Sequence, residues 1–245
     1  MILRLKFVIL LLLGIMPYQC KNNVVRIIKQ SEMIQHSYTG QIANNIAVLI
    51  EEMKLQGITN EFAQIGMLSV IGKESGFIPQ CEKSYSYTSN VRLRKLFGAR
   101  LGQYSESELT ALKSNDIEFF DAIYGRGAKF KWNTGNTEVG DGFKYRGRGF
   151  NQITFKSSYK AYGDTLGIDL VNNPDLLNTV EVASKLAVRF LLKSIKSMKI
   201  NPNNFLTKES ATYAFVKANA GTNKDMTKSD TFKKAKEIEK NLTII

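Results

Sequence analysis

The chain has 245 residues, of which 43% are hydrophobic and 23% are charged, and its formal net charge is +12 at pH 7. These proportions are ordinary for a globular protein, so they exclude a wholly disordered chain and leave room for a sizeable core. The positive charge indicates either an anionic partner (nucleic acid, a membrane surface or an anionic polymer) or simply a lysine-rich soluble surface.

The first twenty residues have the pattern of a signal peptide. Arg4 and Lys6 precede an apolar run from Phe7 to Met16, which is too short to span a bilayer. We therefore expect an exported protein, either secreted or periplasmic, or lipid-anchored at the cell envelope. Cys20 stands where a bacterial lipoprotein carries its modified cysteine, so membrane attachment through a lipidated Cys20 and simple cleavage after it both stay open.

The remaining cysteine and the lone histidine carry no predicted chemistry. Cys81 is left single, and we interpret it as a small buried apolar residue and not as a nucleophile. His36 lies in a polar stretch and is expected to be an exposed linker residue.

Helical periodicity dominates the rest of the chain. Residues 21–37 are expected to form a linker, and apolar residues then recur at helical spacing from Ile42 to Met53 and from Phe62 to Ile71, with Asn60 as the N-cap of the second helix. Residues 150–154 are the best candidate for a strand. Further helices are predicted over residues 92–101, from Ser105, and over 115–124, 157–166, 180–195, 209–218 and 228–242.

No internal repeat, low-complexity segment or convincing linker interrupts residues 38–245, so one mainly α domain and a monomer are the simplest predictions. The sequence shows no metal-ligand spacing and no phosphate-binding loop, so we expect no metal and no cofactor. A nucleic-acid partner would depend on charge alone, and we do not expect one.

Two glutamates flank a chain reversal. Glu74 ends a predicted helix, and Glu82 follows a Ser-Gly break eight residues later. Such a pair can supply the acid and the base for cleavage of a glycosidic bond. Glu74 would then need a raised pKa, which partial burial against Phe77 and Ile78 would provide, whereas Glu82 should stay ionised in its loop. The alternative is that both are ordinary surface glutamates.

A longer set of motifs gives this pair a context. The run Gly140–Phe155 (GDGFKYRGRGFNQITF), followed by Tyr159 and by Gly167–Leu177, resembles glycoside hydrolase family 19, which comprises chitinases and phage endolysins with a lysozyme-like helical fold. Lys73–Phe77 is similar to the His-Glu-Ser/Thr-Gly-Gly acid motif of that family. Ala218–Thr222 is similar to its Ile-Asn-Gly-Gly segment. The resemblance runs from about residue 60 to 225.

The resemblance implies a lysozyme-like α+β fold: a bilobal helical domain over residues 38–245 with a small β/loop element and a central cleft. It implies that Glu74 is the general acid, that Glu82 is the general base and that Thr154 helps to hold the attacking water. Arg146 and Arg148 would brace the glycine-rich turn. The residues expected to contact the substrate are Gln152, Asn219, Tyr145, Ser158 and Tyr87, although the family often has Asn in place of Ser158 and one sugar contact is then lost.

The sequence departs from the family pattern at the acid motif. Lys73 replaces the usual histidine and one glycine is missing, so Glu138 or Asp141 stays open as the base. Aromatic side chains also stack on sugar faces, and we expect one or two of a larger set to do so. That set is Trp132, Tyr85, Tyr87, Tyr124 and Tyr145.

The resemblance therefore predicts an inverting endo-hydrolase of β-1,4 bonds in polymers that contain N-acetylglucosamine, with a polysaccharide as its partner. Chitin and peptidoglycan are both open as substrates, and the positive charge favours the anionic bacterial wall. The alternative is a non-catalytic protein that binds cell-wall glycan with an enzyme-like fold.

Overall fold

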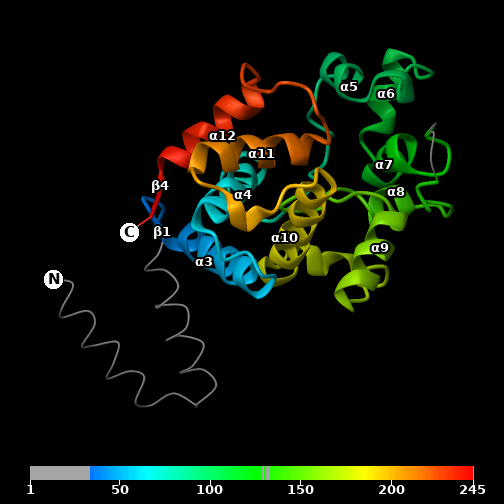
Figure 1. Cartoon of the computed structure of the whole chain (residues 1–245). Helices are drawn as coiled ribbons and strands as arrows, with labels where there is room; N and C mark the ends of the chain where they lie inside the picture. Colours follow the sequence, from blue (N-terminus) through cyan, green and yellow to red (C-terminus); the bar gives the residue numbers. More distant parts are fainter. Residues whose placement is uncertain (1–33, 129, 131–132, 245) are drawn as a thin grey trace. The chain divides into compact units, whose positions relative to one another are not determined.

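The computed structural model describes residues 34–128, 130 and 133–244 (Figure 1). The predicted signal peptide, most of the predicted linker and Trp132 lie outside the described residues. None of the described helices is both long enough and apolar enough to cross a membrane.

Helices account for most of the described chain, which confirms the predicted mainly α fold. The α-helices are α3 (Gly40–Leu55), α4 (Glu61–Ser75), α5 (Asn90–Phe97), α6 (Glu106–Leu112), α7 (Asp116–Tyr124), α8 (Asp141–Lys144), α9 (Lys156–Leu166), α10 (Val180–Ser197), α11 (Lys208–Ala220) and α12 (Asp230–Lys240). Short 3-10 turns are η1 (Gly98–Arg100), η2 (Pro174–Asn178) and η3 (Pro202–Asn204). The strands are β1 (Ile34–His36), β2 (Gln80–Cys81), β3 (Arg148–Gly149) and β4 (Leu242–Ile244).

The chain divides into two compact units. The first contains the described residues up to Lys73 together with those from Leu191 onward, and the second contains Glu74–Phe190. The divisions fall inside α4 and α10, which explains why the sequence shows no linker there.

In the first unit, β1 pairs antiparallel with β4, with Ile34 opposite Ile244. The residues of β1 belong to the segment, 21–37, that is predicted to be a linker. His36 is half-buried in β1, with its ring centroid 5.9 Å from that of Tyr38, so its prediction as an exposed linker residue is wrong.

Helix α4 is buried on nearly all sides in the first unit. A Cβ added at Gly66 would lie 2.8 Å from the backbone carbon of Ala211 in α11, so these two helix backbones meet where only glycine fits. Asn60 caps α4 as predicted, because its side-chain oxygen accepts a hydrogen bond from the Ala63 N–H at 2.9 Å.

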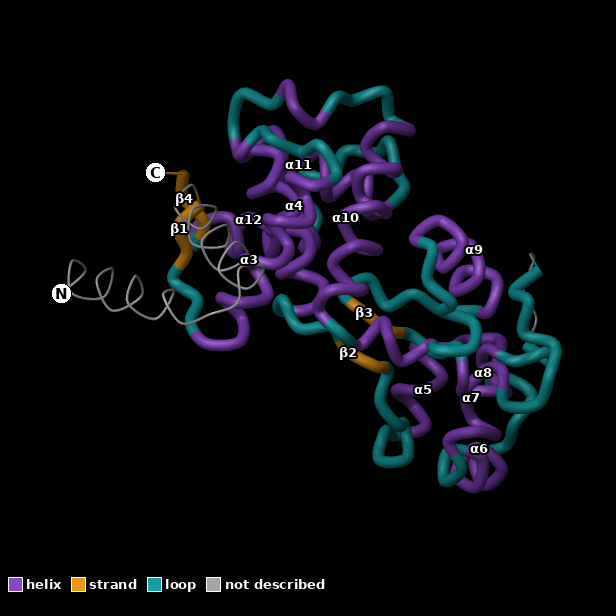
Figure 2. The backbone as a smooth tube through the Cα atoms, turned by 90° about the horizontal axis from the view of Figure 1, so that it is seen from below, coloured by secondary structure: helices purple, strands orange, loops and turns teal. Residues whose placement is uncertain are grey.

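In the second unit, β2 pairs antiparallel with β3, and Figure 2 shows the two strands side by side. The strand predicted over 150–154 is displaced: β3 ends at Gly149, and residues 150–152 form a turn. Gly149 and Gln152 both have positive φ (79° and 51°), which turns the chain back so that Ile153 bridges to Arg148.

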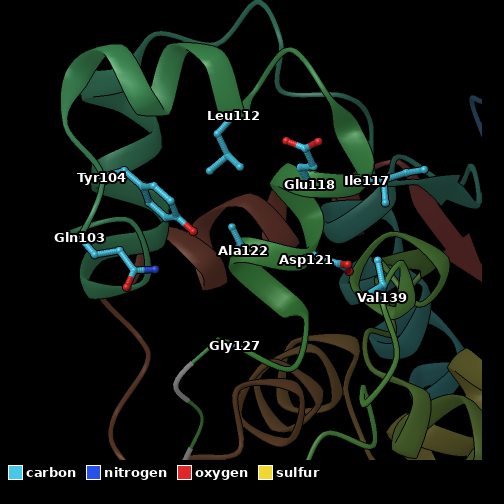
Figure 3. Close-up of a pocket in the computed structure, with 9 residues that line it drawn as sticks. All are labelled: Gln103, Tyr104, Leu112, Ile117, Glu118, Asp121, Ala122, Gly127 and Val139. Atoms are coloured by element: carbon cyan, nitrogen blue, oxygen red, sulfur yellow. The ribbon is translucent and has the colours of Figure 1, made fainter.

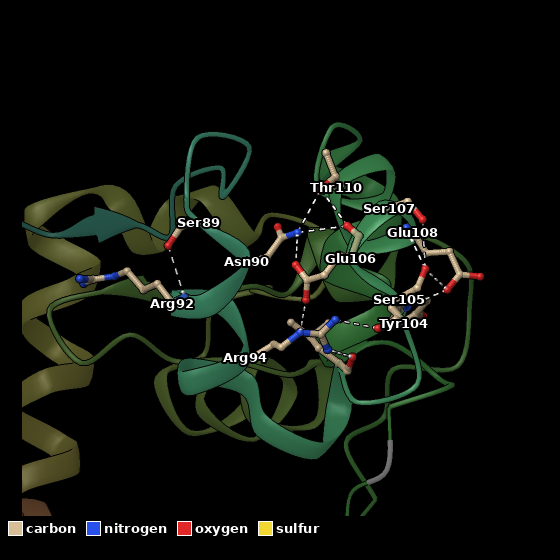
Figure 4. Close-up of polar contacts among 11 residues, drawn as sticks. Ser89, Asn90, Arg92, Arg94, Tyr104, Ser105, Glu106, Ser107, Glu108 and Thr110 are labelled. Carbon is tan, nitrogen blue, oxygen red and sulfur yellow. Dashed lines mark hydrogen bonds and ion pairs between the residues drawn. The ribbon is translucent and has the colours of Figure 1, made fainter.

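Helices α5, α6 and α7 enclose an aromatic cluster in the second unit. Its buried members are Leu93, Phe97, Leu101, Leu109, Phe119, Phe120 and Ile123. Side-chain caps define where these short helices begin (Figure 4): Ser89 accepts from Arg92, and Ser105 forms a capping box with Glu108. Arg94 pairs with Glu106 at 2.9 Å and so links α5 to α6.

Candidate functional site

Glu82 follows β2, and the turn that precedes β3 fixes its backbone. The Glu82 N–H donates to the Gly147 carbonyl at 2.7 Å. The Arg146 guanidinium donates through Nε to the Glu82 carbonyl at 3.1 Å. The position of Glu82 is therefore set by residues 64 and 65 positions later in the chain.

The Glu82 carboxylate accepts three hydrogen bonds. Tyr85 donates to Oε1 at 2.7 Å and Tyr124 donates to the same oxygen at 3.1 Å. The Gly147 N–H donates to Oε2 at 3.1 Å. A carboxylate that receives donors on both oxygens is held in one orientation, and a general base needs a fixed orientation toward its water.

Two features keep the tyrosine hydroxyls protonated. Burial is the largest cause that raises the pKa of Tyr85 and that of Tyr124 above the ordinary value of 10.0, and the negative charge of Glu82 adds to the increase. The phenols therefore act as hydrogen-bond donors to Glu82 over the whole physiological range.

Gly147 lies against two functional groups at once. A Cβ at this position would lie 2.7 Å from Oε1 of Gln152 and 3.1 Å from Oε2 of Glu82. The amide oxygen and the carboxylate oxygen therefore face the same small space, which exists because residue 147 has no side chain.

Gln152 and Thr154 belong to the hairpin turn beside this space. Gln152 donates through Nε2 to the carbonyls of Gln80 (2.9 Å) and Gly149 (3.2 Å), which orients its amide oxygen. The Thr154 hydroxyl donates to the Gln152 carbonyl at 3.1 Å and is half-buried. Glu82, Gln152 and the turn that carries Thr154 therefore lie close together.

The two arginines brace the turn in different ways. Arg146 also donates to the Phe143 carbonyl at 2.7 Å, and its guanidinium lies 3.9 Å from the centroid of the Phe143 ring. Arg148 is only 3% exposed and donates to the Lys144 carbonyl (2.7 Å) and to the Tyr159 hydroxyl (3.0 Å). Arg146 contacts the backbone of Glu82, whereas the Arg148 guanidinium bonds to the turn, to Tyr159 in α9 and to Asp175 in η2.

Glu74 is the penultimate residue of α4 and is exposed. The partial burial that the sequence analysis expects for it is not observed. Phe77, one of the two apolar residues expected to cover it, is itself buried at 1% exposure with φ 63°. Its side chain therefore belongs to the core of the unit.

The predicted sugar-contacting residues lie in different environments. Tyr145 is 1% exposed, packs against Tyr159 at 5.3 Å between ring centroids and donates to the Val171 carbonyl. We therefore correct its assignment from sugar stacking to core packing, because no face of its ring is free. Tyr87 is fully exposed, and Ser158 is half-buried in the first turn of α9.

Asn219 lies in α11 and belongs to the first unit, whereas the other predicted site residues that the structure describes belong to the second.

The two alternative bases differ from Glu82. Asp141 is 5% exposed, and its Oδ2 accepts from the N–H groups of Thr137 (3.0 Å) and Glu138 (3.1 Å) and from Lys156 (3.4 Å). It therefore stabilises the loop before α8. Glu138 is exposed and accepts from the Thr137 hydroxyl at 3.2 Å.

Cys81, predicted to be buried, is half-buried in β2, and its thiol lies 3.7 Å from the Glu82 carbonyl. Among the described residues, no group of three or more His, Cys, Asp or Glu side chains could hold a metal ion.

A pocket of about 360 Å³ lies beside α7 (Figure 3). It is lined by Gln103, Tyr104, Leu112, Ile117, Glu118, Asp121, Ala122, Gly127 and Val139. The Asp121 carboxylate is engaged by the N–H groups of Gly140 (2.6 Å) and Gly142 (2.8 Å). No predicted catalytic residue lines this pocket.

The sequence analysis missed the roles of Tyr85, Tyr124 and Gly147. It treats both tyrosines as sugar-stacking candidates, and only Tyr85, three residues after Glu82, could have been related to it by spacing. Nothing in the sequence relates Tyr124 or the Gly147 N–H to this carboxylate.

Comparisons with known proteins match part of this region, and Glu74 and Glu82 lie outside the residues that the family model matches. The family model for class I chitinases matches residues 120–207. A glycosyl hydrolase family 19 domain-containing protein of Haemophilus influenzae is 31% identical over 137 residues, which cover 56% of this chain and 64% of the relative. An endochitinase of Avena sativa is 32% identical over 108 residues, which cover 42% of this chain and 52% of that protein. The chain thus spans less than two thirds of the length of these relatives.

A solved structure of a bacterial family 19 chitinase aligns over 88% of this chain and 90% of its own, with a TM-score of 0.41 and 16% identity. The family model and the sequence relatives confirm the predicted resemblance, with residues 120–207 as the matched segment: the chain is related to glycoside hydrolase family 19.

Proposed function

We propose that this protein is an inverting glycoside hydrolase that cleaves β-1,4 bonds in polymers of N-acetylglucosamine. The observation that carries the proposal is the environment of Glu82, whose carboxylate is held by three donors. Two of those donors, Tyr124 and Gly147, lie in the segment that matches the family model.

In the proposed reaction, Glu74 donates a proton to the glycosidic oxygen as the bond from C1 to that oxygen breaks. Glu82 accepts a proton from a water molecule as the water oxygen bonds to C1 from the opposite face. The Thr154 hydroxyl would help to orient this water. The sugar product is released with its anomeric configuration inverted, and no covalent intermediate forms.

Chitin is the substrate that the relatives favour, since an endochitinase is among them. The net charge of +12 favours an anionic polymer, and peptidoglycan with its attached polymers is such a material. We therefore propose that both glycans be tested as substrates. From the pattern of residues 1–20 alone, we also propose that the protein is exported and acts outside the cytoplasm, either free or anchored through Cys20.

The test uses soluble N-acetylglucosamine oligomers and peptidoglycan, with product anomers followed by NMR immediately after cleavage. We expect the product to be the α-anomer at first. Glu82→Gln and Glu74→Gln should each reduce turnover by at least ~100-fold, because each removes a proton-transfer group. Glu181→Gln is the matched control, since Glu181 is an exposed glutamate of the same unit and no candidate for the acid or the base. A β-anomeric product, or full activity in Glu82→Gln, would refute the mechanism.

One observation favours a second function. Glu74 is exposed, whereas a glutamic acid that donates a proton at neutral pH is usually shielded from water. A protein that binds wall glycan without cutting it would not need that shielding. Binding to chitin or peptidoglycan without any release of sugar, unchanged in Glu74→Gln, would support this alternative.

A further inference from the structure

We propose that Tyr85 and Tyr124 are positioning residues that occupy Oε1 of Glu82 and leave Oε2 as the atom that takes the proton from water. This inference rests on the proposed role of Glu82 as the base. It assigns work to two hydroxyls that neither the sequence resemblance nor the comparisons assign.

The two carboxylate oxygens of Glu82 differ in how many of their acceptor positions are filled. Each carboxylate oxygen has two lone pairs in its plane. Both positions on Oε1 are filled, by Tyr85 at 2.7 Å and by Tyr124 at 3.1 Å. Oε2 receives one donor, the Gly147 N–H at 3.1 Å, so one of its positions remains for a water molecule.

Oε2 of Glu82 faces a space in which a water molecule can bind. It lies beside the space left by the missing side chain of Gly147, and the Gln152 amide oxygen borders the same space. A water that donates one proton to Oε2 can donate the other to the amide oxygen of Gln152. On attack at C1, the proton on the Oε2 side passes to Oε2, which leaves Glu82 neutral and the new C1 hydroxyl complete.

Aromatic packing fixes the rings of Tyr85 and Tyr124. The Tyr85 ring lies 5.3 Å from that of Phe97 and 5.4 Å from that of Phe119, measured between centroids. Tyr124 lies 5.6 Å from Phe155. Among the described residues, both hydroxyls donate to Glu82 alone. The aromatic cluster therefore holds the donors in place before any substrate arrives.

Both tyrosines can be changed to phenylalanine, which removes the hydroxyl and keeps the ring packing. We expect kcat to fall about tenfold in Tyr85→Phe and in Tyr124→Phe, and further in the double variant, because Glu82 can then rotate. KM should change less than about threefold, since neither ring is proposed to bind sugar. Tyr162→Phe is the control: it is a half-buried tyrosine of the same unit with no contact to Glu82.

The pH dependence separates positioning from general stability. Tyr85 and Tyr124 face the carboxylate of Glu82, and Arg146 faces its carbonyl. The positive charge of Arg92 acts on Tyr85, and that of Arg100 acts on Tyr124. Hydroxyl donors favour an ionised carboxylate, so the acid limb of the kcat profile should move to higher pH in the double variant. A change confined to thermal stability, with kcat and its pH profile intact, would overturn the inference.

A direct measurement makes the test independent of turnover. The carboxyl carbon of Glu82 can be titrated by NMR in protein labelled with ¹³C-glutamate and assigned with Glu82→Gln. We expect its titration curve to move to higher pH in the double phenylalanine variant, and superimposable curves would overturn the inference. If that shift occurs while Glu82→Gln keeps full activity, the hydrogen bonds are as described but Glu82 is not the base, and both proposals fail in their catalytic part. If Glu82→Gln is inactive while the double variant matches the parent in kcat and titration, only this inference fails.

Discussion

Substitution of Gly147 by alanine probes the space that faces both Glu82 and Gln152. The three atoms nearest to the added Cβ are all side-chain atoms: Oε1 of Gln152 at 2.7 Å, Oε2 of Glu82 at 3.1 Å and Cδ of Gln152 at 3.5 Å. The φ of Gly147 is outside the positive range, so alanine can adopt the backbone conformation. The new methyl group would therefore displace functional groups and leave the fold intact.

The contact distances give the size of the effect. Ordinary contacts of a Cβ begin at 3.4 Å, so Oε2 of Glu82 must withdraw from 3.1 Å and Oε1 of Gln152 from 2.7 Å. A misplacement of about 1 Å in a catalytic group can cost ~100-fold in rate, so shifts of about 0.3 Å for Glu82 and about 0.7 Å for Gln152 should together cost about tenfold. Only the ends of flexible side chains move, so the free energy of unfolding should change by less than about 1 kcal/mol.

The assay measures kcat on N-acetylglucosamine oligomers and the free energy of unfolding in guanidinium chloride. Gly102→Ala is the matched control, because its Cβ would meet the Ala99 carbonyl at an ordinary 3.4 Å. Gly142→Ala is the opposite control: its Cβ would meet the backbone oxygen of Phe120, so that variant should lose ~2 kcal/mol or more of stability. Full activity in a folded Gly147→Ala protein, or a loss of stability as large as that of Gly142→Ala, would refute the reasoning.

Three further predictions test the surroundings of the site. Arg148→Met should lower the free energy of unfolding by about 3 kcal/mol because it leaves buried partners unpaired. Asp175→Asn removes only the charge of a partner that is 79% exposed, so it should cost less than about 1 kcal/mol, and denaturant titration compares the two. Asp141→Asn should cost about 1–2 kcal/mol and leave kcat within about threefold, since Asp141 stabilises a loop; a loss of turnover like that of Glu82→Gln would identify Asp141 as the base instead. Burial raises the pKa of Tyr159 from 10.0 to about 12, so the unfolded chain loses this proton at a lower pH than the folded chain. The stabilisation that comes from the protonated Tyr159 is therefore fully present below about pH 10 and is lost between pH 10 and 12. Between about pH 9 and about pH 11.5 the parent should therefore lose about 2 kcal/mol more stability than Tyr159→Phe, and equal losses would contradict the assignment.

Local signals in the sequence predict the helices well. The Asn60 cap and the apolar run that follows it locate α4, and Ser105 with Glu108 locates the start of α6. Each signal depends on residues three or four positions apart, and such signals are visible without any tertiary contact. The near-complete burial of α4 was not predicted, because it depends on which helices surround it.

The hairpin beside the site shows where local reasoning fails. Residues 150–154 have the composition of a strand, yet the positive φ of Gly149 and of Gln152 turns the chain there. Gly149 can adopt this conformation freely, but Gln152 is not a residue that predicts it. Gln152 is held by its own amide, which donates to the carbonyl of Gln80, 72 residues earlier. A bond over that separation leaves no local pattern in the sequence.

Glu82 and Asp141 differ in ways that only the folded chain reveals. The resemblance to a family motif predicts Glu82 as the base but leaves Glu138 and Asp141 open, because a motif says nothing about which lone pairs are free. The structure distinguishes the two by their donors. Oδ2 of Asp141 accepts two backbone N–H groups and Lys156 and is buried, so that oxygen is already committed to the loop. Glu82 receives donors from positions 3, 42 and 65 residues later, and these fill one oxygen and leave the other with room for a water molecule. Asp141 also keeps one oxygen without these donors, but it is buried, whereas Glu82 is half-buried. An open position on an accessible carboxylate is what suits Glu82 to act as a base.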